Sequence, residues 1–445
     1  MDVESLGSLP VGSLWWRFGD KPWTLSVISK GTLELTPGEL RLAARQDPVV
    51  TLERFAGGDR NASLYAASDL APLRPNVDLS VVGLAYAPGG EPVKQLTARF
   101  QIGPLEKSLV IHGEDRSSPS GAKPFTTVPL RYELAPGGPG TANPVGVAPN
   151  SEGAPARMQR ASGRSTSGGD DLPPIGCGPI PAHWPGRRRL LKGRPVPAQP
   201  SSGGELTLPP DFDLRYYNAA PSDQQLKKLE PGTPIVLENL HPVHGMLRTR
   251  LPKISPQVFV LRNDGERIEQ LATIDSLWID TERSVAVVNW RAQLELGERS
   301  ALRRVWVVIT EAGKRLTWDK LAKLVDTLGA PLNKPLRNKS QRPPPPKHRP
   351  KASERPAGPA PWPVSERNST RTTSVQVGKS MREHHDDESD RLNETQAIRL
   401  QPAKSRATPF EEETQTEITT TASVLVEMRR DGTPPWLAPG AAPAP

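Results

Sequence analysis

Short runs rich in β-branched and aromatic residues recur along most of the chain, and turns that contain glycine or proline separate them. The clearest runs cover 79–87, 97–103, 107–113, 257–262, 271–280, 284–292 and 303–310. Residues 24–35 form two further β-rich runs around Lys30 and Gly31, which predicts a hairpin at that pair. This spacing of runs and turns predicts a mainly β fold, with an antiparallel sandwich or barrel-like body in place of repeated βαβ units.

Two segments have the features of short helices. In 317–329 the apolar side chains fall on one helical face, while Thr317 can cap the start and Gly329 the end. These apolar residues are Trp318, Leu321, Leu324, Val325 and Leu328. Residues 222–229 are a second, shorter candidate that begins at Ser222 as a possible N-cap.

Composition divides the chain near residue 330. Only 35% of the residues are hydrophobic and 51 are proline, as in a folded part joined to a segment that cannot bury enough apolar surface. We expect a β-rich body over 1–330, with a flexible insertion at 150–173, and a disordered, Pro-rich and charged tail over 331–445. Short apolar islands in the tail, at 406–413, 420–428 and 433–440, can dock or fold on a partner or can be incidental.

The distribution of charge argues against a nucleic-acid-binding body. The formal net charge is +8, but residues 1–330 carry 39 Lys and Arg against 35 Asp and Glu. A body of this length with so even a balance has no dominant basic field. The tail has 12 basic and 2 acidic residues over 331–382, then 6 and 12 over 383–445, which is typical of interaction tails.

Cysteine usage and hydropathy indicate a cytoplasmic protein. Cys177 is the single cysteine, so the chain has no internal disulfide and no multi-cysteine metal site. The first residues lack the basic and apolar regions of a signal peptide. No apolar run reaches the roughly 18 residues that a membrane span needs, so we expect no membrane association.

His241 and His244 are the candidate metal ligands. They stand three positions apart and, with a distant carboxylate, could form the site of a metal-dependent hydrolase. Metal sites use three or four ligands, however, and Pro242 disfavours a helix that would aim both rings one way. The alternative interpretation is that both are ordinary loop histidines.

Other chemistry-bearing residues also have two interpretations. His112 and Asp115 resemble a base with its orienting acid, but no nucleophile elbow accompanies them, and a strand end with a polar turn explains them equally. Cys177 can be a reactive thiol or a small buried apolar group.

Arg187, Arg188 and Arg189 follow Trp184, a combination expected for single-strand binding. A solvated or carboxylate-paired surface is the alternative for these three arginines. No Walker loop, dinucleotide fingerprint or kinase motif is present. The sequence thus predicts no catalytic residue, no metal and no cofactor, and favours binding over catalysis.

Seven phrases, in this order, resemble one family. They are RPNVDLSVVGLAYAPGGEPV (74–93), RFQIGPLEKSLVIHGEDR (99–116), PFTTVPLRYELAPGGPGTANPVG (124–146), GCGPIPAHWPGRRRLL (176–191), LPPDFDLRYYNAAPSDQQL (208–226), LENLHPVHGMLRTRLP (237–252) and LATIDSLWIDTERSVAVVNWRAQLEL (271–296). The family is the domain of unknown function that is encoded beside type VI secretion spike genes. Its members are effector-loading adaptors or chaperones.

The resemblance implies that the chain is not an enzyme. It implies instead an adaptor that holds an effector in the cytosol and helps to seat it on the VgrG/PAAR spike. It supplies no partner-binding residues and no oligomeric state. The aromatic, amide and proline groups of 215–224 suit fixed loops on a sheet scaffold, where binding residues often lie.

Overall fold

The computed structural model describes residues 3–114, 122–148, 156–160, 173–198 and 200–328. These residues form a mainly β body with several mostly antiparallel sheets and two short helices, which confirms the predicted fold class. Asp115, most of the 150–173 insertion, Gly329 and the 331–445 tail with its apolar islands lie outside the described residues. No helix among the described residues is long and apolar enough to cross a membrane.

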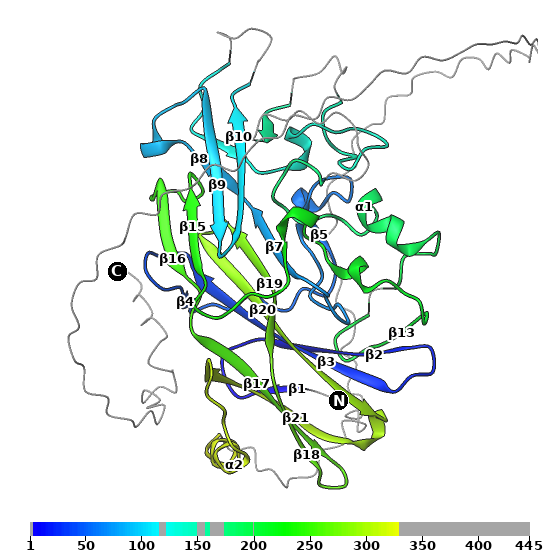
Figure 1. Cartoon of the computed structure of the whole chain (residues 1–445). Coiled ribbons are helices and arrows are strands. Elements are labelled where there is room, and N and C mark those ends of the chain that lie inside the picture. The colour runs from blue at the N-terminus through cyan, green and yellow to red at the C-terminus, as the bar shows by residue number, and fades with distance from the viewer. Residues whose placement is uncertain (1–2, 115–121, 149–155, 161–172, 199, 329–445) are drawn as a thin grey trace, which may run out of the picture. The chain divides into compact units, whose positions relative to one another are not determined.

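The central sheet has eight strands, and β3 and β20 form its longest ladder (Figure 1). Its order is β13 (Glu205–Leu208), β2 (Val11–Phe18), β3 (Trp23–Glu34), β20 (Val285–Gly297), β19 (Thr273–Asp280), β7 (Val77–Val82) and β14 (Gln225–Leu226), with β4 (Arg41–Leu42) paired to β3. Neighbouring strands are antiparallel except β13 with β2 and β19 with β7, which are parallel.

A four-stranded sheet carries the second, longer helix on its outer face. Its order is β1 (Val3–Ser5), β21 (Leu302–Glu311), β17 (Ile254–Arg262) and β18 (Arg267–Leu271). Helix α2 (Trp318–Thr327) confirms the predicted amphipathic helix and lies against this sheet (Figure 1). Its buried Leu321 and Val325 pack on Phe259 and Trp306 of β17 and β21.

A five-stranded sheet and two short ladders complete the described strands. The order is β12 (Met158–Arg160), β10 (Leu105–His112), β9 (Gln95–Ile102), β15 (Pro234–Glu238) and β16 (Met246–Arg250). The ladders pair β11 (Thr127–Pro129) with β8 (Leu84–Tyr86), and β5 (Arg54–Phe55) with β6 (Leu64–Ala66).

Short helical turns lie in the connections. Helix α1 covers Pro185–Arg188, and 3-10 turns cover Ala56–Gly58, Pro88–Gly90, Tyr132–Leu134, Arg189–Leu191, Leu214–Tyr217, Ser222–Gln224 and Arg299–Ala301.

The two faces of the central sheet differ in chemistry. On β20, Val288 and Trp290 point into a continuous apolar core to which all three large sheets contribute. Asn289 and Arg291 point to the opposite face because successive side chains of a strand alternate. Both are nevertheless 4% exposed, since connecting segments cover that face. The polar face of the central sheet is therefore buried.

The predicted hairpin at Lys30 and Gly31 is wrong, because β3 runs unbroken through both residues. Gly31 faces the Trp290 ring on the neighbouring strand, and a Cβ at Gly31 would lie 2.8 Å from that ring. Glycine therefore makes room for an indole and does not mark a turn. Lys30 lies on the other face, where it reaches Asp69.

The predicted helix at 222–229 is also wrong. It contains a single 3-10 turn, Ser222–Gln224, and the chain then enters β14. The Gln224 side chain is fully buried and donates its amide to the carbonyl oxygens of Leu79 and Cys177, both at 2.8 Å. These contacts draw Gln224 into the body and fix the local path of the chain.

Candidate protein-binding groove

Asp69 anchors the segment that covers the polar face of the central sheet. Its carboxylate accepts hydrogen bonds from Lys30 Nζ at 2.8 Å and from Asn289 Nδ2 at 2.8 Å, which come from β3 and β20. The backbone N–H of Val50 donates to the same carboxylate at 2.7 Å. A loop residue thus binds two strands at once.

A second buried carboxylate, Asp275 on β19, lies between two arginines. Arg291 Nε donates to Asp275 Oδ2 at 2.5 Å, and Arg74 Nη1 donates to the same oxygen at 3.2 Å. Arg291 also donates to the carbonyl oxygens of Ala71 and Asp69. The charged groups consequently hold the 68–74 segment on the sheet.

Asp78 on β7 attaches the next covering segment. Its carboxylate accepts from Asn218 Nδ2 and from the backbone N–H of Ala219, both at 2.7 Å, and Arg74 Nε lies 3.4 Å away. Burial raises the pKa of the Asp78 carboxyl, although Arg74 and Asn218 act in the opposite direction. The contact fixes 218–219 beside the sheet.

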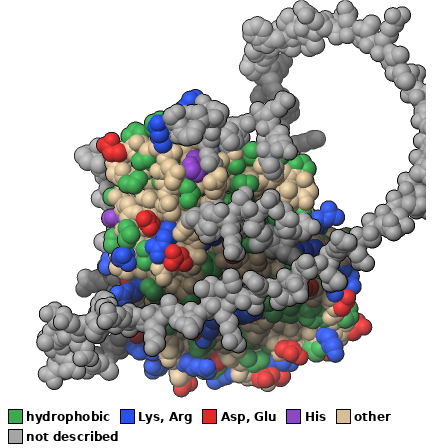
Figure 2. Space-filling model, turned by 45° about the horizontal axis from the view of Figure 1, so that its top comes forward, with side chains coloured by type: hydrophobic (Ala, Val, Ile, Leu, Met, Phe, Trp, Pro, Cys, Tyr) green, Lys and Arg blue, Asp and Glu red, His purple; other side chains and the backbone are tan. Residues whose placement is uncertain are grey.

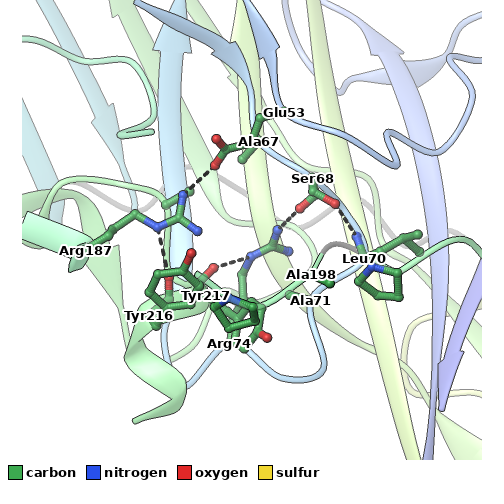
Figure 3. A pocket seen from close by; sticks show the side chains of 13 residues that line it. Glu53, Ala67, Ser68, Leu70, Ala71, Arg74, Arg187, Ala198, Tyr216 and Tyr217 are labelled. Carbon is green, nitrogen blue, oxygen red and sulfur yellow. Dashed lines mark hydrogen bonds and ion pairs between the residues drawn. The ribbon is translucent and has the colours of Figure 1, made fainter. Parts of the chain in front are cut away.

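Arg187 attaches the segment that contains α1 to the neighbouring loops (Figure 3). Its guanidinium is buried and donates to Glu53 Oε1 at 2.8 Å and to the carbonyl oxygens of Tyr216 and Ile180 at 2.9 Å each. In the same view Arg74 donates to the carbonyl oxygens of Ser68 and Tyr217. The cavity among these groups measures about 30 Å³, enough for about two water molecules.

This internal network therefore serves to hold loops, and the space within it is too small for a substrate. A neighbouring cavity beside Lys30 and Asn289 measures about 60 Å³, which is also the size of a few waters. The loops that the network holds in place form a larger hollow on their outer side.

That hollow, which we call the binding groove, has a volume of about 640 Å³. Drug-sized ligands occupy pockets of about 300–1,000 Å³. Its lining combines basic, amide or hydroxyl, and apolar side chains. The principal ones are Arg187, Arg189, Arg215 and Lys227; Asn76, Thr141, Asn218, Ser222 and Gln225; and Pro173, Pro174, Ile180, Pro185 and Leu190. Among the described residues, no acidic and no aromatic side chain lines the groove.

The cations of the groove differ in their neighbours. Arg187 is paired with Glu53 inside the body, and exposed Arg215 forms a two-pronged ion pair with Asp213 that lowers the pKa of that carboxyl. Exposed Lys227 instead donates to the neutral amide oxygen of Asn76 at 2.9 Å. Lys227 therefore brings a positive charge to the groove that this contact does not neutralise.

The three arginines 187–189 do not form one basic patch. Arg187 points inward and pairs with the Glu53 carboxylate, which is the alternative to single-strand binding that the sequence left open. Arg188 and Arg189 are exposed. Trp184 is buried and packs edge-on against Tyr132 at 5.1 Å between ring centroids. Its ring is consequently inaccessible for base stacking.

His241 and His244 do lie together, with ring centroids 4.8 Å apart. His241 Nδ1 accepts the backbone N–H groups of Val243 and His244, both at 3.1 Å, so this nitrogen is used by the turn. Burial, and then His244, lowers the pKa of His241. Within the described ranges, no three His, Cys, Asp or Glu side chains are grouped as metal ligands.

The two remaining candidates lie on or near strands. Cys177 is buried, and burial raises the pKa of its thiol to about 12, which keeps the thiol protonated and favours a packing role. His112 ends β10, and its proposed partner Asp115 is outside the described residues.

The buried network was not predicted from the sequence. Its residues stand at alternate positions of apolar strands, for example Asp78 in β7 and both Asn289 and Arg291 in β20. Such alternation usually indicates a solvent-facing side. Only the three-dimensional structure shows that distant loops cover these side chains.

The chain is thus a mainly β protein whose covering loops form a surface groove. Comparison with protein-family models matches residues 20–291 to the family described as "Uncharacterized protein conserved in bacteria (DUF2169)", and the chain belongs to this family. Comparison with curated proteins gave no match, and comparison with solved structures gave none.

Proposed function

We propose that the chain is a type VI secretion accessory protein. It binds an effector and helps to load it onto the VgrG/PAAR spike by stoichiometric binding, without catalysis. The family match over residues 20–291 shows a bacterial domain of unknown function. The partner and the role are those that the resemblance of the seven phrases implies.

The binding groove is the observation that carries this proposal. Four of the seven phrases that resemble the adaptor family contribute to its walls: 74–93, 124–146, 176–191 and 208–226 supply Asn76, Thr141, Arg189 and Gln225, among others, while Pro173, Pro174 and Lys227 lie outside the phrases. Four of the segments that carry the resemblance therefore meet at one place on the surface. Binding residues commonly lie on loops that a rigid scaffold positions, and a sheet with a buried ionic network is such a scaffold.

A preformed surface suits a protein that acts by holding another polypeptide. Rigid loops lose little conformational freedom on binding, so more of the contact energy remains as affinity. The contacts of Asp78, Arg187 and Asp275 hold the groove walls before any partner arrives.

The proposal also fits the charge distribution on the surface. On the face drawn in Figure 2, the described Lys and Arg side chains lie among Asp and Glu side chains. Mixed charge of this kind gives no extended field of one sign, which nonspecific nucleic-acid binding uses.

Gene deletion and affinity purification test the proposal. Deletion should block delivery of one spike-borne effector while needle assembly continues, and the tagged chain should retain a spike or effector protein. Normal secretion of every spike-borne effector in the deletion strain would refute it. Two measurements separate the alternatives: stoichiometric metal in the purified protein supports the His241 and His244 hydrolase, and salt-sensitive DNA retardation supports a nucleic-acid binder.

A further inference from the structure

The binding groove lies beside one edge of the central sheet. Strand β14 is the last strand of that sheet in the described part of the chain, and it pairs with β7 on one side. Gln225 of β14 lines the groove, and so does Lys227, two positions later. Such an edge can pair with an extended segment of another polypeptide.

The lining favours a polypeptide over a nucleic acid. The carboxamides in the lining are used within the body: Asn76 Nδ2 donates to Gln225 Oε1 at 2.9 Å, and Asn218 Nδ2 donates to Asp78 at 2.7 Å. These bonds fix the shape of the groove wall. Prolines and Leu190 add apolar surface for side chains. Single-stranded nucleic acid binds on aromatic platforms, and the described lining contains no aromatic side chain.

The charges of the lining indicate that the occupant is negatively charged. Arg189, Arg215 and Lys227 come from separate parts of the chain, and no Asp or Glu lies among the described lining residues. Arg215 is paired with Asp213, which is not part of the lining. Lys227 is exposed, and Asn76, to which it donates, is neutral. A carboxylate that lies beside Lys227 thus meets a positive charge that the contact with Asn76 does not neutralise.

We propose that the binding groove takes an extended acidic segment of the partner protein, which pairs with the edge of β14 and places carboxylates near Lys227. The partner's identity rests on the proposed function, whereas the chemistry of the segment rests on the groove alone. Backbone pairing supplies affinity, and the cations select acidic side chains.

Fluorescence anisotropy of the full chain with a model peptide tests the inference. The probe is a short fluorescein-labelled peptide that alternates glutamate and threonine, and the comparison peptide has glutamine for glutamate. We expect the acidic peptide to bind more tightly. Lys227→Gln should weaken its binding about twofold to threefold and Lys227→Glu about fivefold to tenfold.

Matched controls make each outcome decisive. Arg45→Glu reverses an exposed charge in a different open hollow and should leave the affinity unchanged. N-methylation of alternate peptide groups should abolish binding, because it removes the N–H groups that would pair with β14.

Three results would overturn the inference: equal affinity for the glutamine peptide, no effect of Lys227→Glu, or equally effective competition by duplex DNA. Spike co-purification without acidic-peptide binding would overturn the groove assignment alone. Peptide binding without co-purification of spike or effector would overturn the proposed function alone.

Discussion

Replacing Asp275 by asparagine tests whether the buried ionic network holds the covering loops. One oxygen of the Asp275 carboxylate, Oδ2, accepts hydrogen bonds from both Arg291 and Arg74. All three side chains are less than 10% exposed. Asparagine can retain an acceptor at that oxygen. The substitution therefore removes the negative charge while preserving the shape and most hydrogen bonds.

The expected loss is large because two buried guanidinium groups lose their shared carboxylate. Removing one member of a buried ion pair costs about 3–5 kcal/mol. Arg74 keeps Asp78 at 3.4 Å and Arg291 keeps two carbonyl oxygens, so we expect the lower end, about 3 kcal/mol. With an m value of about 3 kcal/mol/M, the urea midpoint should fall by about 1 M.

Equilibrium urea unfolding, followed by tryptophan fluorescence, measures this change. Asp211→Asn is the matched control. Both oxygens of Asp211 accept from Arg194 at 2.8 Å, but this ion pair is exposed to solvent. Its midpoint should equal that of the wild-type protein. Equal midpoints for Asp275→Asn and the wild type would refute the role assigned to the network.

Three other substitutions test the fold. Gly31→Ala should destabilise the body by about 1–3 kcal/mol because its Cβ overlaps the buried Trp290 ring, and thermal unfolding would show this. Leu321→Ala should cost about 2–5 kcal/mol at the α2 contact, and faster hydrogen exchange over 318–327 would report it. The folded body should lose stability as the pH drops below 6.5, because the pKa of His241 is lowered in the folded state and the unfolded chain therefore binds the proton first. Below pH 6.5 the urea midpoint of His241→Gln should depend less on pH than that of the wild-type protein.

Local patterns in the sequence predicted the β class and α2 correctly. The strand runs at 97–103 and 107–113 became β9 and β10, and the apolar face with Leu321 packs as its period indicates. In these elements, burial follows directly from the local period of side chains, which alternate in the strands and recur about every 3.6 residues in the helix.

Long-range contacts explain what the sequence could not predict. Gly31 looks like a turn residue until Trp290, on a strand distant in sequence, is placed against it. Gln224 looks helical until its amide is seen to bond buried carbonyl oxygens. The sequence does not predict the groove: it indicates fixed loops over 215–224, whereas the place of Asn76 beside them depends on tertiary structure.

The central proposal to test is that the chain acts as a stoichiometric binder of a secretion partner. The direct measurement is purification of the tagged full chain from a bacterium with an assembled type VI apparatus, followed by quantitative mass spectrometry. We predict a VgrG or PAAR protein and one effector in a fixed ratio to the chain, with less of both after Lys227→Glu. Recovery of the chain without either protein, together with normal effector secretion in the deletion strain, would contradict the account.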